Sequence, residues 1–137
     1  MLQIMNTTTQ TLLPGQSITF DKILLQSGNG ECCPCNAARV MVPKLKQCGA
    51  IYEVGFDANV TGATADTQVQ MAIAMDGVAL PETVRASTPS VAGSYNGISS
   101  TTLVKNCCGT TTVTVMNSGT NNITVYAGAN LRVKRLS

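Results

Sequence analysis

The strongest constraint in this sequence is a two-residue alternation of apolar and polar side chains that recurs along the chain. From position 52 onward, one parity carries Tyr52, Val54, Phe56, Ala58 and Val60, and the positions between them carry glutamate, glycine, aspartate and asparagine. Successive side chains of a β-strand point to opposite faces of the sheet, so this pattern predicts a strand with one buried face.

The same alternation predicts further strands at 18–20, 23–25, 69–75, 78–80, 99–104, 111–117, 123–127 and 131–134. The change of parity between the first two of these predicts a bulge near Lys22. Turn signals such as Asp76-Gly77 separate the runs, and the spacing of about 8–12 residues is typical of a sandwich or barrel. One helical turn over 81–84 and a loop from Ala86 to Gly97 complete an all-β single domain.

The composition disfavours several classes of protein. The 137 residues are 44% hydrophobic but only 12% charged, against about 25% charged in an ordinary soluble domain. Disorder is therefore disfavoured, and no apolar run approaches the roughly 20 residues of a membrane span. A net charge of +2 is too small for an electrostatic nucleic-acid binder. The shortage of surface charge favours a domain that covers part of itself with copies of itself.

Catalysis is disfavoured because the chain has no histidine, the commonest general base. A Ser-His-Asp arrangement is excluded on the same ground, and no pair of acids is spaced for glycoside hydrolysis. The acids are also too scattered to predict a calcium site. We therefore expect a protein that is not an enzyme and has no cofactor. The first residues lack the basic start and apolar run of a signal peptide, so we expect synthesis in a cytoplasm.

The order of the strands carries a resemblance. A strand ending at Pro43 leads to a turn at Gln47-Cys48-Gly49, then to an aromatic-led strand from Tyr52. The long strand 69–75 turns at Asp76-Gly77, a polar strand 99–104 runs to Cys107-Cys108-Gly109, and the chain closes on Leu131-Arg132-Val133-Lys134-Arg135-Leu136. From about Thr11 to Leu136 the sequence resembles the tumour necrosis factor and complement globular-head superfamily. It is most similar to the bacterial and bacteriophage branch, which includes the tip domains of collagen-like spore-surface fibres.

The resemblance implies a jelly-roll β-sandwich of about 8–10 antiparallel strands that assembles as a tight homotrimer. It divides the chain into an N-terminal arm, residues 1–10, and a jelly-roll domain, residues 11–137. Tyr52, Phe56 and Tyr126 are candidate contributors to the trimer interface. The sequence contains no Gly-X-Y triplets before the domain, so we expect a domain that does not cap a collagen-like stalk.

The six cysteines are the only chemical constellation in the sequence: Cys32, Cys33, Cys35, Cys48, Cys107 and Cys108. Six cysteines allow 15 pairings, which spacing alone does not resolve. The family topology implies that the turn with Cys48 lies beside the turn with Cys107 and Cys108, which makes these three the disulfide candidates. It also implies that the group from Cys32 to Cys35 lies at the opposite end of the sandwich.

Two other states of the cysteines stay open. Cys32, Cys33 and Cys35 are thiolate candidates for a zinc site, although a tetrahedral site lacks a fourth ligand unless a threefold axis supplies it. The other alternative is that all six cysteines are reduced thiols that pack as small buried side chains. Redox catalysis is disfavoured because no helix follows the Cys-Pro-Cys segment to activate a thiol.

Three further segments are candidate contact sites. Leu2 and Ile4, in the predicted arm, are suited to adding a strand to a partner. Arg132, Lys134 and Arg135, with Lys105 nearby, form a basic end suited to an acidic patch on a partner shell. Tyr95 and Asn96, in the loop Ala86–Gly97, are a candidate ligand-binding surface. The alternatives are a frayed terminus and solvated surface.

Two hypotheses for function follow. The first is a structural protein, a trimeric jelly roll on the surface of a bacteriophage virion, where it decorates the capsid or forms a head spike. Its partners are itself and a capsid or other virion protein, with no nucleic acid and no membrane. The alternative is an adhesin module that binds a glycan or a host receptor.

Overall fold

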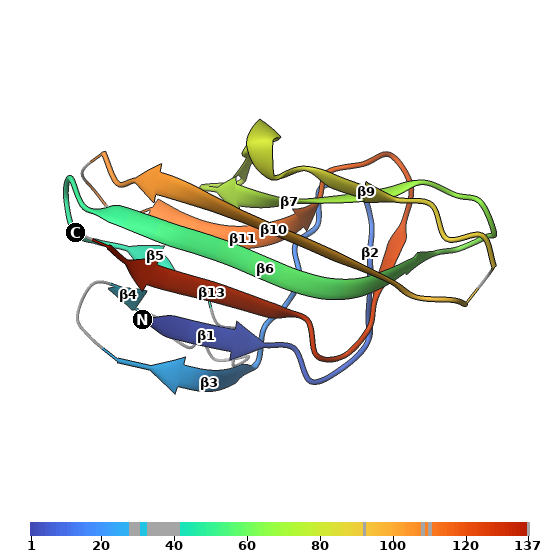
Figure 1. Ribbon diagram of the computed structural model, residues 1–137, viewed down its shortest axis with the longest axis horizontal. Coiled ribbons are helices and arrows are strands. Elements are labelled where there is room, and N and C mark those ends of the chain that lie inside the picture. Colours follow the sequence, from blue (N-terminus) through green and yellow to red (C-terminus); the bar gives the residue numbers. More distant parts are fainter. Residues whose placement is uncertain (28–30, 33–41, 92, 108, 110, 137) are drawn as a thin grey trace.

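The computed structural model describes residues 1–27, 31–32, 42–91, 93–107, 109 and 111–136, with the backbone alone at 31–32. Within these residues the chain forms two antiparallel sheets packed face to face, as predicted (Figure 1). The strands are β1 (Leu2–Met5), β2 (Gln10–Leu12), β3 (Lys22–Gln26), β4 (Glu31–Cys32), β5 (Lys44–Leu45), β6 (Ile51–Gly62), β7 (Val69–Met75), β8 (Val78–Ala79), β9 (Arg85–Ser87), β10 (Asn96–Lys105), β11 (Thr111–Asn117), β12 (Ile123–Val125) and β13 (Asn130–Arg135). A single 3₁₀ turn, η1 (Pro81–Thr83), lies in the one helical turn expected from the sequence.

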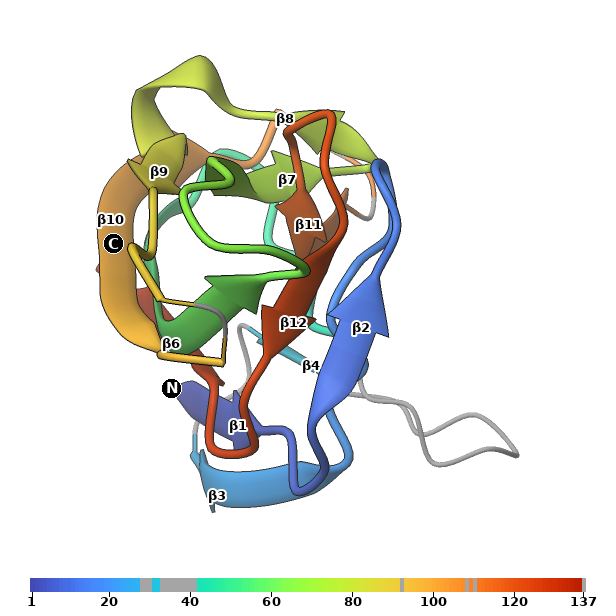
Figure 2. The same cartoon turned by 90° about the vertical axis from the view of Figure 1, so that its right-hand side faces the viewer.

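β6 is the centre of the larger sheet. This seven-stranded sheet has the order β2-β12-β6-β13-β1-β3, and β10 pairs with the other edge of β6. The twelve residues of β6 therefore hydrogen-bond to β10 on one side and to β12 and β13 on the other. The smaller sheet has the order β4-β5-β11-β7-β8, and β9 also pairs with β7. Figure 2 views the sandwich from one end and shows the two sheets on either side of the core.

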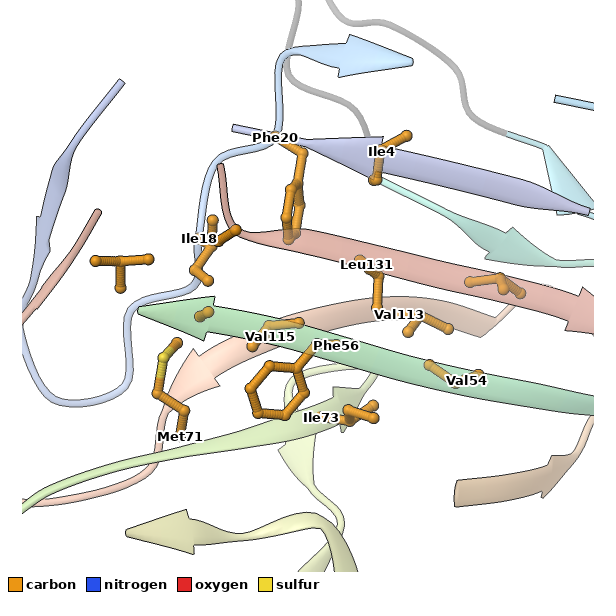
Figure 3. Packing of buried hydrophobic residues seen from close by; sticks show 14 of the residues in the cluster. Ile4, Ile18, Phe20, Val54, Phe56, Met71, Ile73, Val113, Val115 and Leu131 are labelled. Atoms are coloured by element: carbon orange, nitrogen blue, oxygen red, sulfur yellow. The ribbon is translucent and has the colours of Figure 1, made fainter. Parts of the chain in front are cut away.

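The core lies between the two sheets and is built from the apolar parity of each strand. Val54 and Phe56 of β6 point toward Ile73 of β7 and Val115 of β11, and all four are buried (Figure 3). Ile18 and Phe20 enter the same cluster from the segment between β2 and β3, so the strand predicted over 18–20 is not formed although its apolar residues are buried. Burying side chains of this size stabilises the fold by about 1.5–3 kcal/mol each, relative to leaving them exposed.

The Asp76-Gly77 turn joins β7 to β8 as predicted. Both residues have positive φ, 51° and 82°, which matches the two central positions of a type I′ hairpin. The Asp76 carboxylate accepts hydrogen bonds from the backbone N–H and the hydroxyl of Thr112, at 2.9 and 3.1 Å. The turn is thereby tied to the neighbouring strand β11.

The first residues do not form the expected N-terminal arm. β1 lies between β13 and β3, with Leu2 opposite Val133 and Ile4 opposite Leu131. Leu2 and Ile4 are completely buried, so the prediction that they contact a partner is wrong. Their apolar parity is satisfied by the core of their own chain.

Three finer sequence predictions also differ from the structure. Tyr52 and Phe56 are buried inside the sandwich and are not exposed for a trimer contact. Alternation groups residues on one face of a strand but does not say which face is outward. The irregularity in β3 falls at Leu24, where the register against β1 shifts. The expected loop is shorter than Ala86–Gly97, because β9 and β10 take its ends.

Candidate interaction face

The outer side of β6, β10 and β13 is the candidate interaction face, and we call it the outer face. Figure 1 looks onto it: the three strands lie side by side in front, with β7 and β11 behind them. The register aligns their outward side chains in rows, such as Ser99 of β10, Asp57 of β6 and Asn130 of β13. The outward-facing residues are Glu53, Gly55, Asp57, Asn59, Gly97, Ser99, Thr101, Leu103, Asn130, Arg132 and Lys134.

An arginine lies across the centre of the outer face. The Arg132 guanidinium donates to the Asp57 carboxylate and, at 2.7 Å, to the Asn130 side-chain oxygen. It crosses Gly55, where a Cβ would lie 3.1 Å from Arg132 Nη2 and 2.9 Å from Thr101 Oγ1. The missing side chain of Gly55 therefore makes room for the ion pair. Both partners are partly exposed, 36% for Arg132 and 48% for Asp57, so the pair contributes at most about 1 kcal/mol.

A shallow groove of about 340 Å³ opens beside this pair. It is lined mainly by backbone and by short polar side chains: Asp57, Ala58, Asn59, Gly97, Ile98, Ser99, Gly128 and Asn130. Tyr95 lies two residues before Gly97, and Tyr126 lies two residues before Gly128. The two tyrosine rings contact each other, with centroids 5.0 Å apart. The aromatic pair therefore lies near one end of a polar groove.

Exposed aliphatic side chains gather at the other end of the outer face. Leu103 is 61% exposed, the backbone N–H of Leu136 donates to the carbonyl of Ile51, and both Ile51 and Leu136 are exposed. The outer face thus carries polar side chains along most of its length, with Leu103 exposed among them and Ile51 and Leu136 at its edge. Interfaces between proteins contain both kinds of side chain.

A buried asparagine organises the end of the sandwich beside these leucines. Asn106 is fully buried and its side-chain nitrogen donates to the carbonyls of Leu45, Gln47 and Gly109, at 3.1–3.2 Å. Its side-chain oxygen accepts from the Thr111 hydroxyl at 3.1 Å. The loop after β5 is therefore held against the turn after β10.

The structure describes three of the six cysteines, Cys32 through its backbone alone. Cys48 is disulfide-bonded, and Cys107 is an exposed free thiol, so Cys107 is not the partner of Cys48. Cys33, Cys35 and Cys108 lie outside the described residues. Cys32 pairs through its backbone with Lys44, which lies four residues before Cys48. The expectation that Cys32 lies at the opposite end of the sandwich from Cys48 is therefore wrong: the antiparallel pairing of β4 with β5 folds the chain back on itself.

The remaining site candidates separate into two places. Tyr95 belongs to the aromatic pair with Tyr126. The side chain of Asn96 instead donates a hydrogen bond to the Ser87 hydroxyl at 2.9 Å, which links β10 to β9. Arg132 lies in the centre of the outer face, and Lys134 and Arg135 lie exposed at its end. The sequence did not predict that Asp57, Asn59, Ser99 and Asn130 line one groove. The pattern that could have indicated it is that all four are polar residues at outward-facing positions of predicted strands.

Two negative observations apply to the part of the chain that the structure describes. No three or more of its cysteine, aspartate and glutamate side chains cluster closely enough to hold a metal ion. No helix among these residues has the length and apolar character to cross a membrane. The zinc hypothesis for Cys32, Cys33 and Cys35 lies outside the described side chains.

Comparison with known proteins bears on the fold. No protein-family model matches the chain, and no curated protein matches it. Among solved structures, the Eiger TNF of S. frugiperda superposes with a TM-score of 0.71 over 99% of this chain and 91% of that chain, at 9% identity. The chain has a tumour necrosis factor-like jelly-roll fold.

Two other structures are similar. Murine APRIL, at pH 8.5, has a TM-score of 0.57 at 13% identity and covers 97% of this chain and 96% of its own. The PRD1 vertex protein P5 covers 99% and 96%, at 11% identity, but its TM-score of 0.48 is too low to support an argument. At these identities the likeness establishes the fold and leaves function to be argued from the chain's own surface.

Proposed function

We propose that this chain is a non-enzymatic structural protein that assembles as a homotrimer through its outer face and is displayed on a bacteriophage virion. The observation that carries the assembly is an uncovered sheet face with exposed Leu103 on it and the exposed Tyr95 and Tyr126 at one end. Closing a ring of three copies would remove these side chains from water. The shortage of charged residues supports the same assembly, because a covered face needs few of them.

The virion part of the proposal has a different support. The strand order and the closing run from Leu131 to Leu136 resemble the bacteriophage branch of the superfamily. The absence of histidine and of a marked catalytic arrangement fits a structural role on a capsid, as a decoration or a head spike.

Light scattering on a sizing column tests the assembly. We expect three times the chain mass of 14.3 kDa for the natural protein. Leu103→Asp, on the outer face, should give a monomer because it places an unpaired charge in the interface. Val78→Asp is the matched control, since Val78 is 69% exposed on β8 and lies away from the outer face. A monomeric natural protein contradicts the assembly.

Particle composition tests the virion role. Particles of the phage that encodes the chain are purified through a density gradient, and their proteins are identified by mass spectrometry. The chain should remain with the particles, and the Leu103→Asp variant should be depleted from them. Particles without the chain refute the virion proposal, whatever its oligomeric state.

A second candidate function is favoured by the groove. Tyr95 and Tyr126 near a polar groove supply the aromatic surface and hydrogen-bonding groups that a glycan uses. Tyr95→Ala would then abolish binding to an oligosaccharide array without changing the mass in solution. An array with no binding by the natural protein removes this alternative.

A further inference from the structure

We propose that one end of the sandwich is a docking surface for an acidic protein surface. This end, which we call the basic end, comprises Lys46, Lys105 and Arg135 together with Ile51 and Leu136, and it borders the outer face at Lys134. The inference rests on the proposed function, in which the acidic surface belongs to the particle shell. It names the part of the trimer that faces the shell and the chemistry of the contact.

The strand register brings these residues together. Lys105 of β10 lies opposite Ile51 of β6, and Leu136 follows directly after β13, with its backbone N–H bonded to the Ile51 carbonyl at 2.8 Å. Lys134 lies opposite Glu53. Three strands therefore begin or end side by side here, which Figure 1 shows at the end where β6 starts.

Asn106 adds the loop after β5 to the same end. Its side chain bonds to the carbonyls on both sides of Lys46, those of Leu45 and Gln47, and the backbone of Gly49 donates to the Asn106 carbonyl at 2.8 Å. Lys46 is exposed, and Lys105 is the residue directly before Asn106. The lysines are thus displayed on a rigid frame and not on a free loop.

The charge distribution is uneven. Of the eight lysine and arginine side chains in the described residues, five lie at this end or at its border when the half-buried Lys44 and the bordering Lys134 are included. The acids at this end with described side chains are Glu53 and Asp76, and Asp76 is already bound by Thr112. The backbone of Glu31 also lies here, opposite Leu45. A chain with a net charge of only +2 therefore concentrates its positive charge at one end.

The surroundings of the lysines favour an acidic protein over a nucleic acid. Exposed Ile51 and Leu136 lie among the charges, which fits an interface with an apolar centre and a charged rim. The exposed tyrosines Tyr95 and Tyr126 lie at the far end of β6, where the Tyr126 N–H bonds to the Asn59 carbonyl. Single-stranded nucleic acids bind by stacking bases on exposed aromatic rings, and Tyr52, the described aromatic residue at the basic end, is completely buried.

Cyclic symmetry would multiply the contact. In a ring of three copies, equivalent points lie at the same height along the axis, so all three basic ends face the same side of the assembly. Three weak contacts made together bind far more tightly than one, because the second and third are intramolecular. An acidic shell surface with threefold character is the partner that fits.

Binding to poly-L-glutamate tests the inference on the full chain. Fluorescence anisotropy of labelled polymer is measured at low salt, with a DNA duplex and phosphatidylglycerol vesicles as comparison probes. Lys46→Glu with Lys105→Glu should weaken binding by about tenfold or more. Lys22→Glu with Arg85→Glu makes the same change in net charge away from the basic end and should change binding by less than about twofold. Circular dichroism confirms that both variants are folded.

Each outcome has a defined meaning. Equal loss in the two variants, no binding by the natural protein, or tighter binding to DNA or vesicles overturns the inference. The mass of each sample is measured by light scattering in parallel. A natural trimer that does not bind poly-L-glutamate refutes the docking surface alone, whereas a monomer that binds refutes the trimer and leaves the docking surface standing.

Discussion

At the scale of single residues, the outer face depends on a side chain that is absent. Gly55 stands in the middle of β6, with no turn and no positive φ to require a glycine. The space above Gly55 is occupied by the Thr101 hydroxyl and by the Arg132 guanidinium, which reaches over the glycine to Asp57. The glycine is therefore part of the outer face and not of the fold's turns.

Replacing Gly55 by alanine should lower the free energy of unfolding by about 1–2 kcal/mol, because the new methyl group overlaps Thr101 and Arg132. The matched control is Gly97→Ala on neighbouring β10, where the nearest atom, Asn59 Oδ1, is 3.5 Å from the built Cβ. Urea unfolding of the two variants compares them directly. Equal stability of both would show that Arg132 moves aside without cost.

Buried asparagines are the residues whose roles the sequence hid. Asn6, Asn106 and Asn117 are fully buried, and each bonds through its side chain to backbone groups of a loop or turn. A polar residue beside glycine or threonine suggests exposed turn chemistry. The hydrogen bonds that keep these three inside come from residues up to 122 positions away, which no local pattern contains.

At the scale of elements, the alternation of apolar residues predicted the interior strands well. The bounds of β7 and β11 agree with the expected 69–75 and 111–117, because each strand has a core-facing parity and ends at a turn signal. β1 was missed because four residues are too few to establish a period. Alternation also does not reveal which strands become neighbours, so the Arg132–Asp57 contact across 75 positions needed the structure.

The central position of β1 gives a test. Leu2→Ala should lower the free energy of unfolding by about 2–5 kcal/mol, since Leu2 is completely buried between β13 and β3. Leu13→Ala, at a side chain that is 51% exposed, is the control and should cost less than about 1 kcal/mol. Chemical denaturation followed by circular dichroism measures both. A free N-terminal arm would instead make Leu2→Ala silent.

At the scale of the whole molecule, the Cys48 disulfide is a covalent constraint on a chain with short strands. Reduction should lower stability by about 2–4 kcal/mol, because the unfolded chain regains the freedom that the cross-link removes. Thermal melts with and without reductant measure the change.

Cys107→Ser provides the control for the disulfide, because the Cys107 thiol is exposed and free and lies 3.7 Å from the Lys105 carbonyl. This variant should melt at the natural temperature and remain sensitive to reductant. Identical melts of the natural protein in both conditions would mean that no disulfide contributes to stability.

The pairing of β6 has a consequence for the order in which the chain is made. β6 pairs with β10, β12 and β13, and β1 pairs with β13, so both strands pair with strands that come later in the chain. The ribosome makes these strands after β6, so a twelve-residue strand with a continuous apolar side stays unpaired at least until β10 has been made. Folding is therefore dominated by distant contacts and should be slow, and newly made chains should be prone to aggregate until the last strand has emerged.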